Sequence, residues 1–476
     1  MFPCVHFLRP TFLLFTLAWL LCAWATAEER SMDVIRSYEK NPAYWQYKGR
    51  PVLLIGGSAE DNEFQIEGLR EELDLLRSLG GNYVRNTMSS RDPGNVWPFA
   101  RDKQTGKYDL DRWSDEYWQR FERFLKLTGE RDIIVQIEVF DRFDFAREPW
   151  TQNPFNPRNN TNYTAEQSRL KEAIDTHPSR RESAFFRSLP GRENIPVVLQ
   201  YQRAFVDRML ASSLKYGHVL YCISNETNEP PDWGAYWADH IHRRAREAGM
   251  TVQVTEMWDA HNILDATHEA TWKDPGRYGF ADISQNNHQK GEAHWRNAHA
   301  FLKQIRESGK LRPVNAVKTY GADTGRYGND QDGTERFWRH LIGGLASVRF
   351  HRPPSGLGLT PKAQAHVKSA RMLADRFDFF SATPDVGHTL LLERQVNEAY
   401  CTRVEGKQYA VYFPNGGAVR LDLQKTPSRF ELRWLDIATA SWQEPMPIRG
   451  GAAVELKSPG RGQFVALLGA VSEKGP

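Results

Sequence analysis

One short stretch holds the clearest chemical pattern in the sequence. Residues 218–233 read HVLYCISNETNEPPDW, in which an apolar run at 219–223 stops at Asn225 and Glu226 and two prolines then prevent its continuation. A buried strand that ends on a carboxylate is the way a parallel-stranded barrel presents a reactive group at its active face. The pattern therefore predicts Glu226 as a general acid/base, with Asn225 beside it orienting the substrate.

Cleavage of a glycosidic bond needs a second carboxyl group. One group is protonated to assist the leaving oxygen, and the other is ionised to stabilise or trap the cation. Glu256, which follows the fifth apolar run, is the best-placed partner, and Glu138 after the third run is the alternative. A separation of roughly 6.5 to 9.5 Å between the two groups would imply inversion at the anomeric carbon. We predict Glu226 and Glu256 as the catalytic pair.

These residues need a scaffold, and the apolar pattern predicts one. Eight short apolar runs alternate with amphipathic helical segments, and the runs are residues 52–55, 83–84, 133–139, 219–223, 252–254, 280–284, 313–317 and 345–350. Eight strand-helix units predict an α/β protein with a (β/α)8 TIM barrel, whose reactive groups lie at the strand carboxyl ends. We expect the barrel to span residues 28–380. A long connection at about 141–194 is expected to form a lid or wall over its mouth.

The pattern changes to a period of two after residue 380. Residues 409–413 and 419–423 flank the turn Pro414-Asn415-Gly416-Gly417, which predicts a hairpin, and further alternating runs follow at 430–435 and 464–468. Residues 381–476 are therefore predicted to form a small all-β antiparallel sandwich domain.

Polar residues follow nearly every predicted strand. Because the carboxyl ends of parallel strands meet at one face of a barrel, we expect these side chains to line a common site. The predicted substrate-binding residues are Asn225, Arg85, Asn86, Glu138, Asp141, Trp258, His288, Lys318, Tyr320, Arg349 and His351. The Trp258 ring would offer a flat face for a sugar, with packing in the core the equally weighted alternative.

Other classes of site are disfavoured. Asp259, His261 and His288 are conceivable metal ligands, but no HExxH or paired short-spacing motif supports a metal, so hydrogen-bonding roles are expected and no cofactor is predicted. Gly56-Gly57 has no phosphate-loop context, which argues against a nucleotide. The net charge of +3 gives no footprint for nucleic acid or an anionic membrane. A carbohydrate is the expected partner, and the oligomeric state is left open.

The first residues predict export. Residues 1–27 combine Arg9, an apolar core and the sequence Ala25-Thr26-Ala27, which is typical of a cleaved secretory signal with cleavage after Ala27. The apolar part is too short to span a membrane. We therefore expect a secreted or periplasmic protein. Two of the four cysteines lie in this leader, so a disulfide framework is excluded.

The motif and the overall plan resemble known enzymes. Asn225-Glu226 on the fourth strand resembles the Asn-Glu signature of the (β/α)8 retaining glycoside hydrolase superfamily, in which the Glu is acid/base and the Asn holds a substrate hydroxyl. The Gly-Gly-Ser first strand, long third loop and C-terminal β-sandwich are similar to the apiosidase-like group of secreted bacterial proteins. That superfamily places its nucleophilic Glu at the end of the seventh strand. Residues 312–321 contain no acid, and Lys318 stands about where the nucleophile is expected.

Three hypotheses follow from this departure. In the favoured one, Glu226 works as acid/base with a displaced carboxylate, and the protein is a secreted glycoside hydrolase. In the second, Arg349 and Lys318 hold an acidic sugar while Tyr320 or His288 removes a proton, which is polysaccharide lyase chemistry. In the third, the barrel has lost catalysis and keeps carbohydrate binding.

Overall fold

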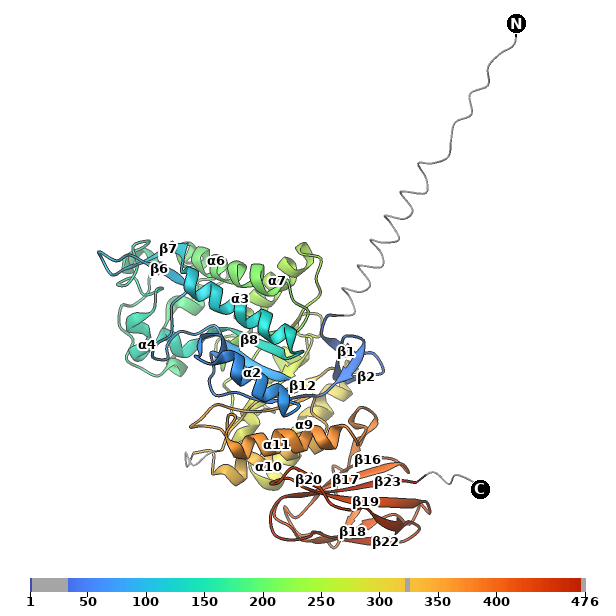
Figure 1. Cartoon of the computed structure of the whole chain (residues 1–476). Helices are drawn as coiled ribbons and strands as arrows, with labels where there is room; N and C mark the ends of the chain where they lie inside the picture. The colour runs from blue at the N-terminus through green and yellow to red at the C-terminus, as the bar shows by residue number, and fades with distance from the viewer. Residues whose placement is uncertain (2–32, 322–325, 472–476) are drawn as a thin grey trace.

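The computed structural model describes residues 1, 33–321 and 326–471, so the predicted leader, apart from Met1, lies outside the described residues. Eight parallel strands form one sheet in the order β10-β9-β8-β5-β4-β13-β12-β11 (Figure 1). Their bounds are β4 (Leu54–Gly57), β5 (Tyr83–Thr87), β8 (Ile134–Asp141), β9 (Val219–Asn225), β10 (Gln253–Thr255), β11 (Ala281–Asp282), β12 (Val314–Thr319) and β13 (Ser347–Phe350). Every residue of β8 and β9 is buried, as expected for strands covered on both faces.

The two ends of this strand order meet and close the barrel. The Gly279 amide just before β11 donates to the Val254 carbonyl of β10 at 3.0 Å, and the Thr255 hydroxyl donates to the Phe280 carbonyl at 2.8 Å. The predicted TIM-barrel fold is therefore confirmed, with a strand at each of the eight predicted apolar runs. The first run is shared between β4 and a short strand before it.

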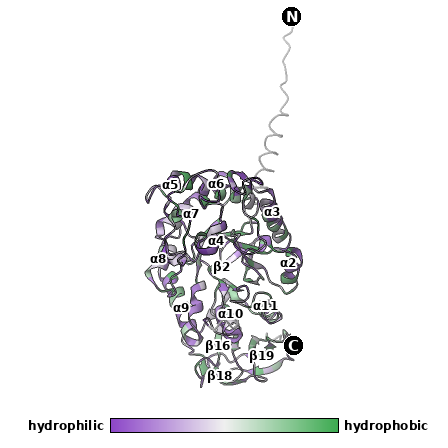
Figure 2. Ribbon diagram, turned by 90° about the vertical axis from the view of Figure 1, so that its left-hand side faces the viewer, coloured by the Kyte–Doolittle hydropathy of each residue, from purple (hydrophilic) through white to green (hydrophobic). Residues whose placement is uncertain are grey.

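Eight helices surround the barrel in chain order (Figure 2). They are α2 (Leu69–Ser78), α3 (Asp115–Glu130), α6 (Pro196–Ser213), α7 (Pro231–Glu247), α8 (Ala266–Trp272), α9 (Gly291–Glu307), α10 (Asp330–Ile342) and α11 (Pro361–Ala374). Helix α3 illustrates how they form. The Ser114 side chain caps the Tyr117 amide, and Tyr117, Phe121 and Phe124 recur at helical spacing on the buried face. None of the described helices is both long and apolar enough to cross a membrane.

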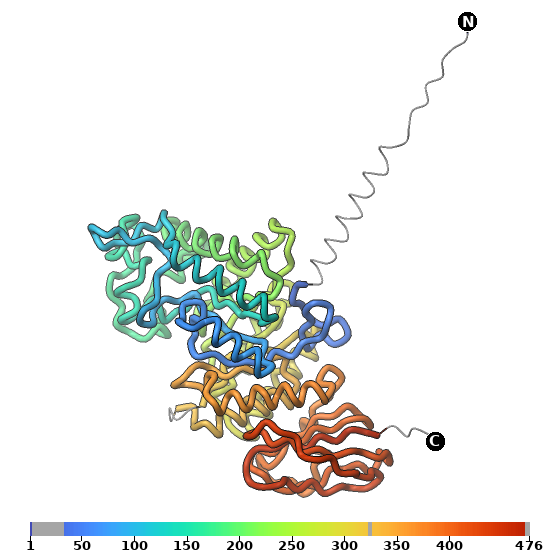
Figure 3. The backbone as a smooth tube through the Cα atoms, viewed as in Figure 1, coloured from blue at the N-terminus to red at the C-terminus, as the bar shows by residue number. Residues whose placement is uncertain are grey.

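A three-stranded antiparallel sheet that the sequence did not predict covers the amino end of the barrel. It contains β1 (Arg36–Tyr38), β2 (Asn41–Tyr47) and β3 (Arg50–Val52), and it lies on the opposite side of the barrel from β6 (Phe99–Arg101) and β7 (Tyr108–Trp113) (Figure 3). Trp45 of β2 is fully buried, and its indole N–H donates to Asn315 Oδ1 at 2.9 Å near the start of β12. This sheet closes the end of the barrel that carries no predicted chemistry.

The long connection after β8 is folded, and it packs beside the loop that follows β9. Its short helices are η2 (Arg142–Phe145), α4 (Arg147–Gln152), α5 (Ala165–Ser168), η3 (Pro178–Arg180) and η4 (Ala184–Arg187). Asparagine side chains replace regular hydrogen bonding here: Asn156 Nδ2 donates to the Trp150 and Glu172 carbonyls, both at 2.9 Å. Asn228 Nδ2, in the loop after β9, donates to the Ser179 carbonyl at 2.7 Å. The insertion is therefore a wall beside the barrel mouth.

The C-terminal strands form two antiparallel sheets that enclose their own apolar core. Their bounds are β14 (Thr383–Pro384), β15 (Leu391–Leu392), β16 (Tyr400–Val404), β17 (Gln408–Phe413), β18 (Ala418–Asp422), β19 (Arg429–Asp436), β20 (Ser441–Trp442), β21 (Met446–Arg449), β22 (Ala453–Lys457) and β23 (Phe464–Ala470). The predicted hairpin is wrong, because β17 pairs with β16 and β23 while β18 lies in the other sheet. Gly416 turns the chain between sheets at φ 67°. The sandwich packs on α10 and α11, where Tyr412 stacks on Trp338.

Replacement of Trp45 tests whether the unpredicted sheet supports the barrel. Trp45→Ala removes a fully buried indole and leaves Asn315 Oδ1 without its donor, so the free energy of unfolding should fall by about 3 to 5 kcal/mol in urea titration. Trp442→Ala, at a half-buried tryptophan of β20, is the matched control and should cost clearly less. Equal losses in the two variants would contradict a supporting role for the sheet.

Candidate active site

The backbone at the end of β9 brings two successive side chains to one point. In an extended strand, neighbouring side chains point to opposite faces, and Ser224 accordingly faces α7, where its hydroxyl accepts from Trp233 Nε1 at 3.3 Å. Asn225 therefore faces the barrel interior, and a continued strand would turn Glu226 outward. Instead Glu226 adopts a left-handed φ of 55°, which is uncommon for a residue with a side chain. This conformation turns its carboxylate into the mouth.

Lys318 at the end of β12 is the group that both side chains meet. Its Nζ donates to Asn225 Oδ1 at 2.8 Å and to Glu226 Oε1 at 2.5 Å. The lysine is 2% exposed, and a buried ammonium is stable only when paired. Tyr320 adds a third contact, since its hydroxyl donates to Glu226 Oε1 at 3.2 Å. The position that lacks the expected nucleophile thus supplies the counter-charge of Glu226.

This environment fixes the charge of Glu226. Burial alone would raise the pKa of Glu226, but the Lys318 ammonium and then the Arg142 guanidinium outweigh burial and lower the pKa from 4.5 to about 2. The carboxylate is therefore ionised at neutral pH. A general acid must hold its proton at the working pH, so the free protein presents Glu226 in its basic form. Its side chain keeps 14% of its surface exposed to the mouth.

Glu138 and Asp61 share one arginine on the other side of the mouth. Arg85 of β5 binds Glu138 through two parallel contacts, Nε to Oε1 at 2.6 Å and Nη2 to Oε2 at 2.5 Å, and its Nη1 binds Asp61. All three side chains are buried. The bidentate pair engages both oxygens of Glu138, and the side chain is 0% exposed, so a substrate in the mouth does not reach it. Glu138 consequently positions Arg85 and is a poor candidate for the second catalytic carboxylate.

Asp141 links this pair to Asn225. Asn225 Nδ2 donates to Asp141 Oδ2 at 2.9 Å, and the same oxygen accepts from Arg91. Arg91 also lies 3.8 Å from Asp61 Oδ2. Positive and negative groups therefore alternate around the mouth from β5 to β12. The amide of Asn225 is held at both ends, by Asp141 and by Lys318, so its orientation is fixed before any substrate binds.

Glu256 is not in contact with Glu226 among the described residues. Its Oε1 accepts from the backbone amides of Ser224 at 2.9 Å and Met257 at 3.1 Å, and Oε2 is buried beside Gly234 of α7. A Cβ at Gly234 would lie 2.6 Å from Oε2, so the glycine makes room for the carboxyl group. Burial raises the pKa of Glu256 well above its ordinary value. The predicted second catalytic residue therefore lies between the barrel and α7, with its carboxyl group held by backbone amides and beside Gly234.

Asp259 is the carboxylate that the structure places beside Glu226. The loops after β9 and β10 pair through the backbone of Thr227. Its amide donates to the Met257 carbonyl, and its carbonyl accepts from the Asp259 amide, both at 2.8 Å. Arg142 Nη2 then lies 2.6 Å from Asp259 Oδ1 and 3.9 Å from Glu226 Oε2. Because both distances end on one nitrogen, the two carboxylates lie within reach of a single glycosidic bond. The Asp259 side chain is 22% exposed.

The other predicted binding residues divide into two groups. Trp258 is 2% exposed with its indole N–H bound to the Thr271 hydroxyl at 2.7 Å, so the ring presents no face to a sugar. Asn86 and Arg349 are also fully buried; Asn86 accepts from the Phe64 amide at 3.1 Å, and Arg349 donates to the Val317 carbonyl at 3.0 Å. Their placement is that of framework residues, because neither side chain has any surface exposed to the mouth.

His288 and His351 lie at the mouth. The His351 ring packs on Tyr320 with centroids 4.6 Å apart, and His288 stacks on His261 at 3.7 Å. Burial, and then His261, lower the pKa of His288 to about 4, so its imidazole is neutral at pH 7. Asp61, Arg91 and Arg142 also belong to the mouth without a prediction from sequence. Arg142 directly follows Asp141 at the end of β8, which is the one local signal that pointed to it.

Comparison with known proteins places the fold. No protein-family model matches the chain, and no curated sequence matches it. A glycoside hydrolase family 5 structure from Bacteroides vulgatus ATCC 8482 has a TM-score of 0.62 at 14% identity, covering 94% of this chain and 96% of its own. The chain has the fold of this glycoside hydrolase. A second structure, described as a glycoside hydrolase, gives a TM-score of 0.62 at 12% identity and covers 94% and 99% of the two chains. The apiosidase-like resemblance stays a prediction.

The ion pair between Lys318 and Glu226 makes stability depend on acid pH. A carboxylate with a lowered pKa contributes stability above its unfolded pKa, and that contribution is lost as pH falls from about 4.5 toward about 2. Lys318→Met leaves burial unopposed by the ammonium, so the pKa of Glu226 should rise and proton uptake should move to higher pH. We expect the variant to lose about 3 kcal/mol or more of unfolding free energy at pH 7. Urea titrations between pH 3 and 7 measure both effects.

Two further variants make this test specific. Lys310→Met replaces an exposed lysine ahead of the same strand and should leave the stability profile unchanged. The double variant Lys318→Met, Glu226→Gln should be less destabilised than the sum of the single variants, because neither partner is then left charged alone. Additive losses would mean that the two groups do not interact.

Proposed function

We propose that this protein hydrolyses glycosidic bonds of an oligo- or polysaccharide at the carboxyl end of its barrel, with Glu226 as the essential carboxylate. The observation that carries the proposal is the geometry of Glu226: a strained backbone turns it into the mouth, and Lys318 with Tyr320 hold it ionised. Strain of this kind persists where the surrounding structure enforces it, and it concentrates at functional sites. The fold shared with a family 5 glycoside hydrolase supports the same reaction class.

Glu226 enters the reaction in its basic form. An ionised carboxylate can take a proton from an attacking water or stabilise the cation that develops at the anomeric carbon. Lys318 remains buried beside it and keeps the carboxylate charged while the sugar displaces water from the mouth. Asn225, fixed between Lys318 and Asp141, presents its amide as a positioning group for a substrate hydroxyl.

Asp259 replaces Glu256 as the proposed partner that protonates the leaving oxygen. It faces Glu226 across Arg142, and the Nε and Nη1 atoms of Arg142 are buried without a hydrogen-bond partner among the described residues. Unsatisfied guanidinium donors are costly, and oxygens of a bound sugar would satisfy them.

Hydrolysis of a polysaccharide panel by wild type and Glu226→Gln tests the proposal. Glutamine keeps the shape of the side chain and can still accept from Lys318, but it removes the counter-charge of that lysine, so the variant should be less stable than wild type. Assayed below its own thermal midpoint, it should show a kcat about 10²- to 10⁴-fold lower. Asp259→Asn should also lower kcat. Glu256→Gln is the matched control: the Glu256 side chain lies beside Gly234 of α7, and glutamine has nearly the same shape, so this variant should retain activity. Reducing-end release measures all four proteins.

Each alternative has its own outcome in the same experiment. An unsaturated, ultraviolet-absorbing product would identify a lyase built on Lys318, Tyr320 and His288, and would overturn hydrolysis. Glycan binding with no product from any panel member would identify a carbohydrate-binding protein on an inactive barrel. Activity that survives Glu226→Gln would remove this residue from the mechanism.

Export is the second part of the proposal, and it rests on the pattern of residues 1–27 alone. Expression of the full chain in a bacterial host should give a mature protein that begins at Glu28 and is recovered from the periplasm or medium. Amino-terminal sequencing checks the cleavage site. A cytoplasmic protein that retains Met1 would contradict export.

A further inference from the structure

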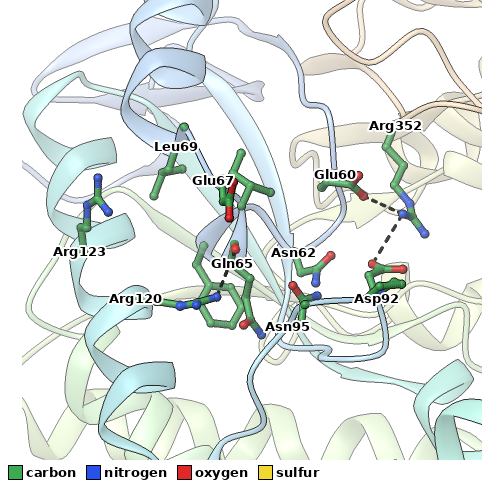
Figure 4. A pocket seen from close by; sticks show the side chains of 15 residues that line it. Glu60, Asn62, Gln65, Glu67, Leu69, Asp92, Asn95, Arg120, Arg123 and Arg352 are labelled. Atoms are coloured by element: carbon green, nitrogen blue, oxygen red, sulfur yellow. Dashed lines mark hydrogen bonds and ion pairs between the residues drawn. The ribbon is translucent and has the colours of Figure 1, made fainter.

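A second cavity lies outside the catalytic mouth, on the flank of the barrel. It has a volume of about 630 Å³, within the range of small-molecule binding clefts. The loops after β4 and β5 form two of its sides, and helix α3 forms the third. Figure 4 shows Asn62 and Asn95 between Arg120 on one side and Arg352 on the other. None of these four residues belongs to the proposed catalytic pair.

The cavity holds a polar group that the described part of the protein leaves without a partner. Asn95 Nδ2 is buried without a hydrogen-bond partner among the described residues. Asn62 in the same wall is 2% exposed, and its side chain does not cap the short helix Glu63–Gln65 that follows it. Unpaired buried amides carry a free-energy cost, and most buried polar groups avoid it. In contrast, Gln65 in the same wall is satisfied, since it donates to the Val96 carbonyl at 3.0 Å and accepts from the Val96 amide at 2.8 Å.

The charges lining the cavity balance. Glu60, Glu67 and Asp92 oppose Arg120, Arg123 and Arg352. Arg352 is occupied by Glu60 at 2.7 Å, and Arg120 by Glu116 at 2.5 Å. An anionic ligand would meet as many carboxylates as guanidinium groups, so charge gives it no advantage. Together with the apolar surfaces of Ile66 and Pro93, the amides suit a neutral ligand with an apolar face and a hydroxyl edge.

Arg352 connects this cavity to the catalytic mouth. Its Nε lies 2.9 Å from Asp61 Oδ2, and the other oxygen of Asp61 binds Arg85 inside the mouth. The Asp61 side chain therefore lies between the cavity and the mouth, and it contacts one arginine of each. A saccharide chain that extends from the mouth toward this cavity would meet Arg352, which lines the cavity and contacts Asp61.

We propose that this cavity is a second carbohydrate-binding site that takes neutral sugar units, with Asn62, Asn95 and Arg123 as its hydrogen-bonding residues. The site lies on different loops from the catalytic pair and is independent of whether the mouth hydrolyses its substrate. Where the proposed hydrolysis holds, the cavity anchors a distant part of the same chain and favours long substrates over short ones.

Calorimetric titration of the mature Glu226→Gln protein tests the site. The probes are the hexasaccharides of β-1,4-linked mannose, glucose and xylose. We expect at least one of them to bind, and Asn95→Ala or Arg123→Ala to weaken that binding about 5- to 10-fold, as expected for one lost hydrogen bond. Arg123 is exposed, so its replacement should leave the thermal midpoint unchanged. Lys126→Ala, one turn along α3 and outside the cavity, is the matched control and should bind like the parent.

The results separate this site from the proposed catalysis. Binding that ignores both cavity variants, or no binding of any of the three hexasaccharides, would overturn the second site. Displacement of the bound hexasaccharide by inorganic phosphate, lost in Arg123→Ala, would identify an anion site and would also overturn it. Failure of the hydrolytic proposal has a different signature, namely a wild-type protein that releases no product. The cavity variants should leave hydrolysis of a short aryl glycoside unchanged, because that substrate does not reach the cavity.

Discussion

The contact of Lys318 with Glu226 is the interaction on which the site depends. A lysine that is 2% exposed must meet a negative charge, and the carboxylate it meets lies on the opposite side of the barrel mouth, after β9. To reach the same ammonium as Asn225, Glu226 must leave the alternation of the strand, which it does with a left-handed backbone. One ion pair thus determines the direction, the charge and the basicity of the residue that the sequence marks most clearly.

The same electrostatic logic sorts the remaining acids of the mouth. Glu138 and Asp61 are bound by Arg85, and Asp141 is bound by Arg91, so their charges are neutralised within the protein. Glu256 has no such cation, and burial beside α7 raises its pKa, which favours its neutral form. Glu226 and Asp259 are the pair that keeps partial exposure on a shared cation, Arg142. Among these acids, Glu226 and Asp259 are in this way the two that keep partial exposure to the mouth.

The scaffold separates stability from chemistry. The sheet of β1 to β3 closes the amino end of the barrel through Trp45, and the C-terminal sandwich packs on the outer helices α10 and α11. The sheet lies away from the strand carboxyl ends, and the sandwich packs outside the ring of helices. The loops that follow β4, β5 and β8 carry the polar residues instead, and asparagine side chains hold the longest of them in place. Loops on a rigid barrel can therefore build both the mouth and the flanking cavity without disturbing the core.

The sequence by itself determined the barrel, the C-terminal all-β region and the ring of polar residues, because buried parallel strands need continuous apolar runs and a barrel gathers whatever follows them at one face. It singled out Glu226 and Lys318 for the same reason. Only the tertiary structure decided which side chains enter the mouth. Trp258 and Glu256 follow the same strand, yet both side chains point into the protein. For Glu256, Gly234 of α7 leaves the space that the carboxyl group occupies. Asp259 reaches Glu226 through pairing of two loops with Arg142 from a third. Those directions depend on one backbone angle and on helices distant in sequence, which no local pattern encodes.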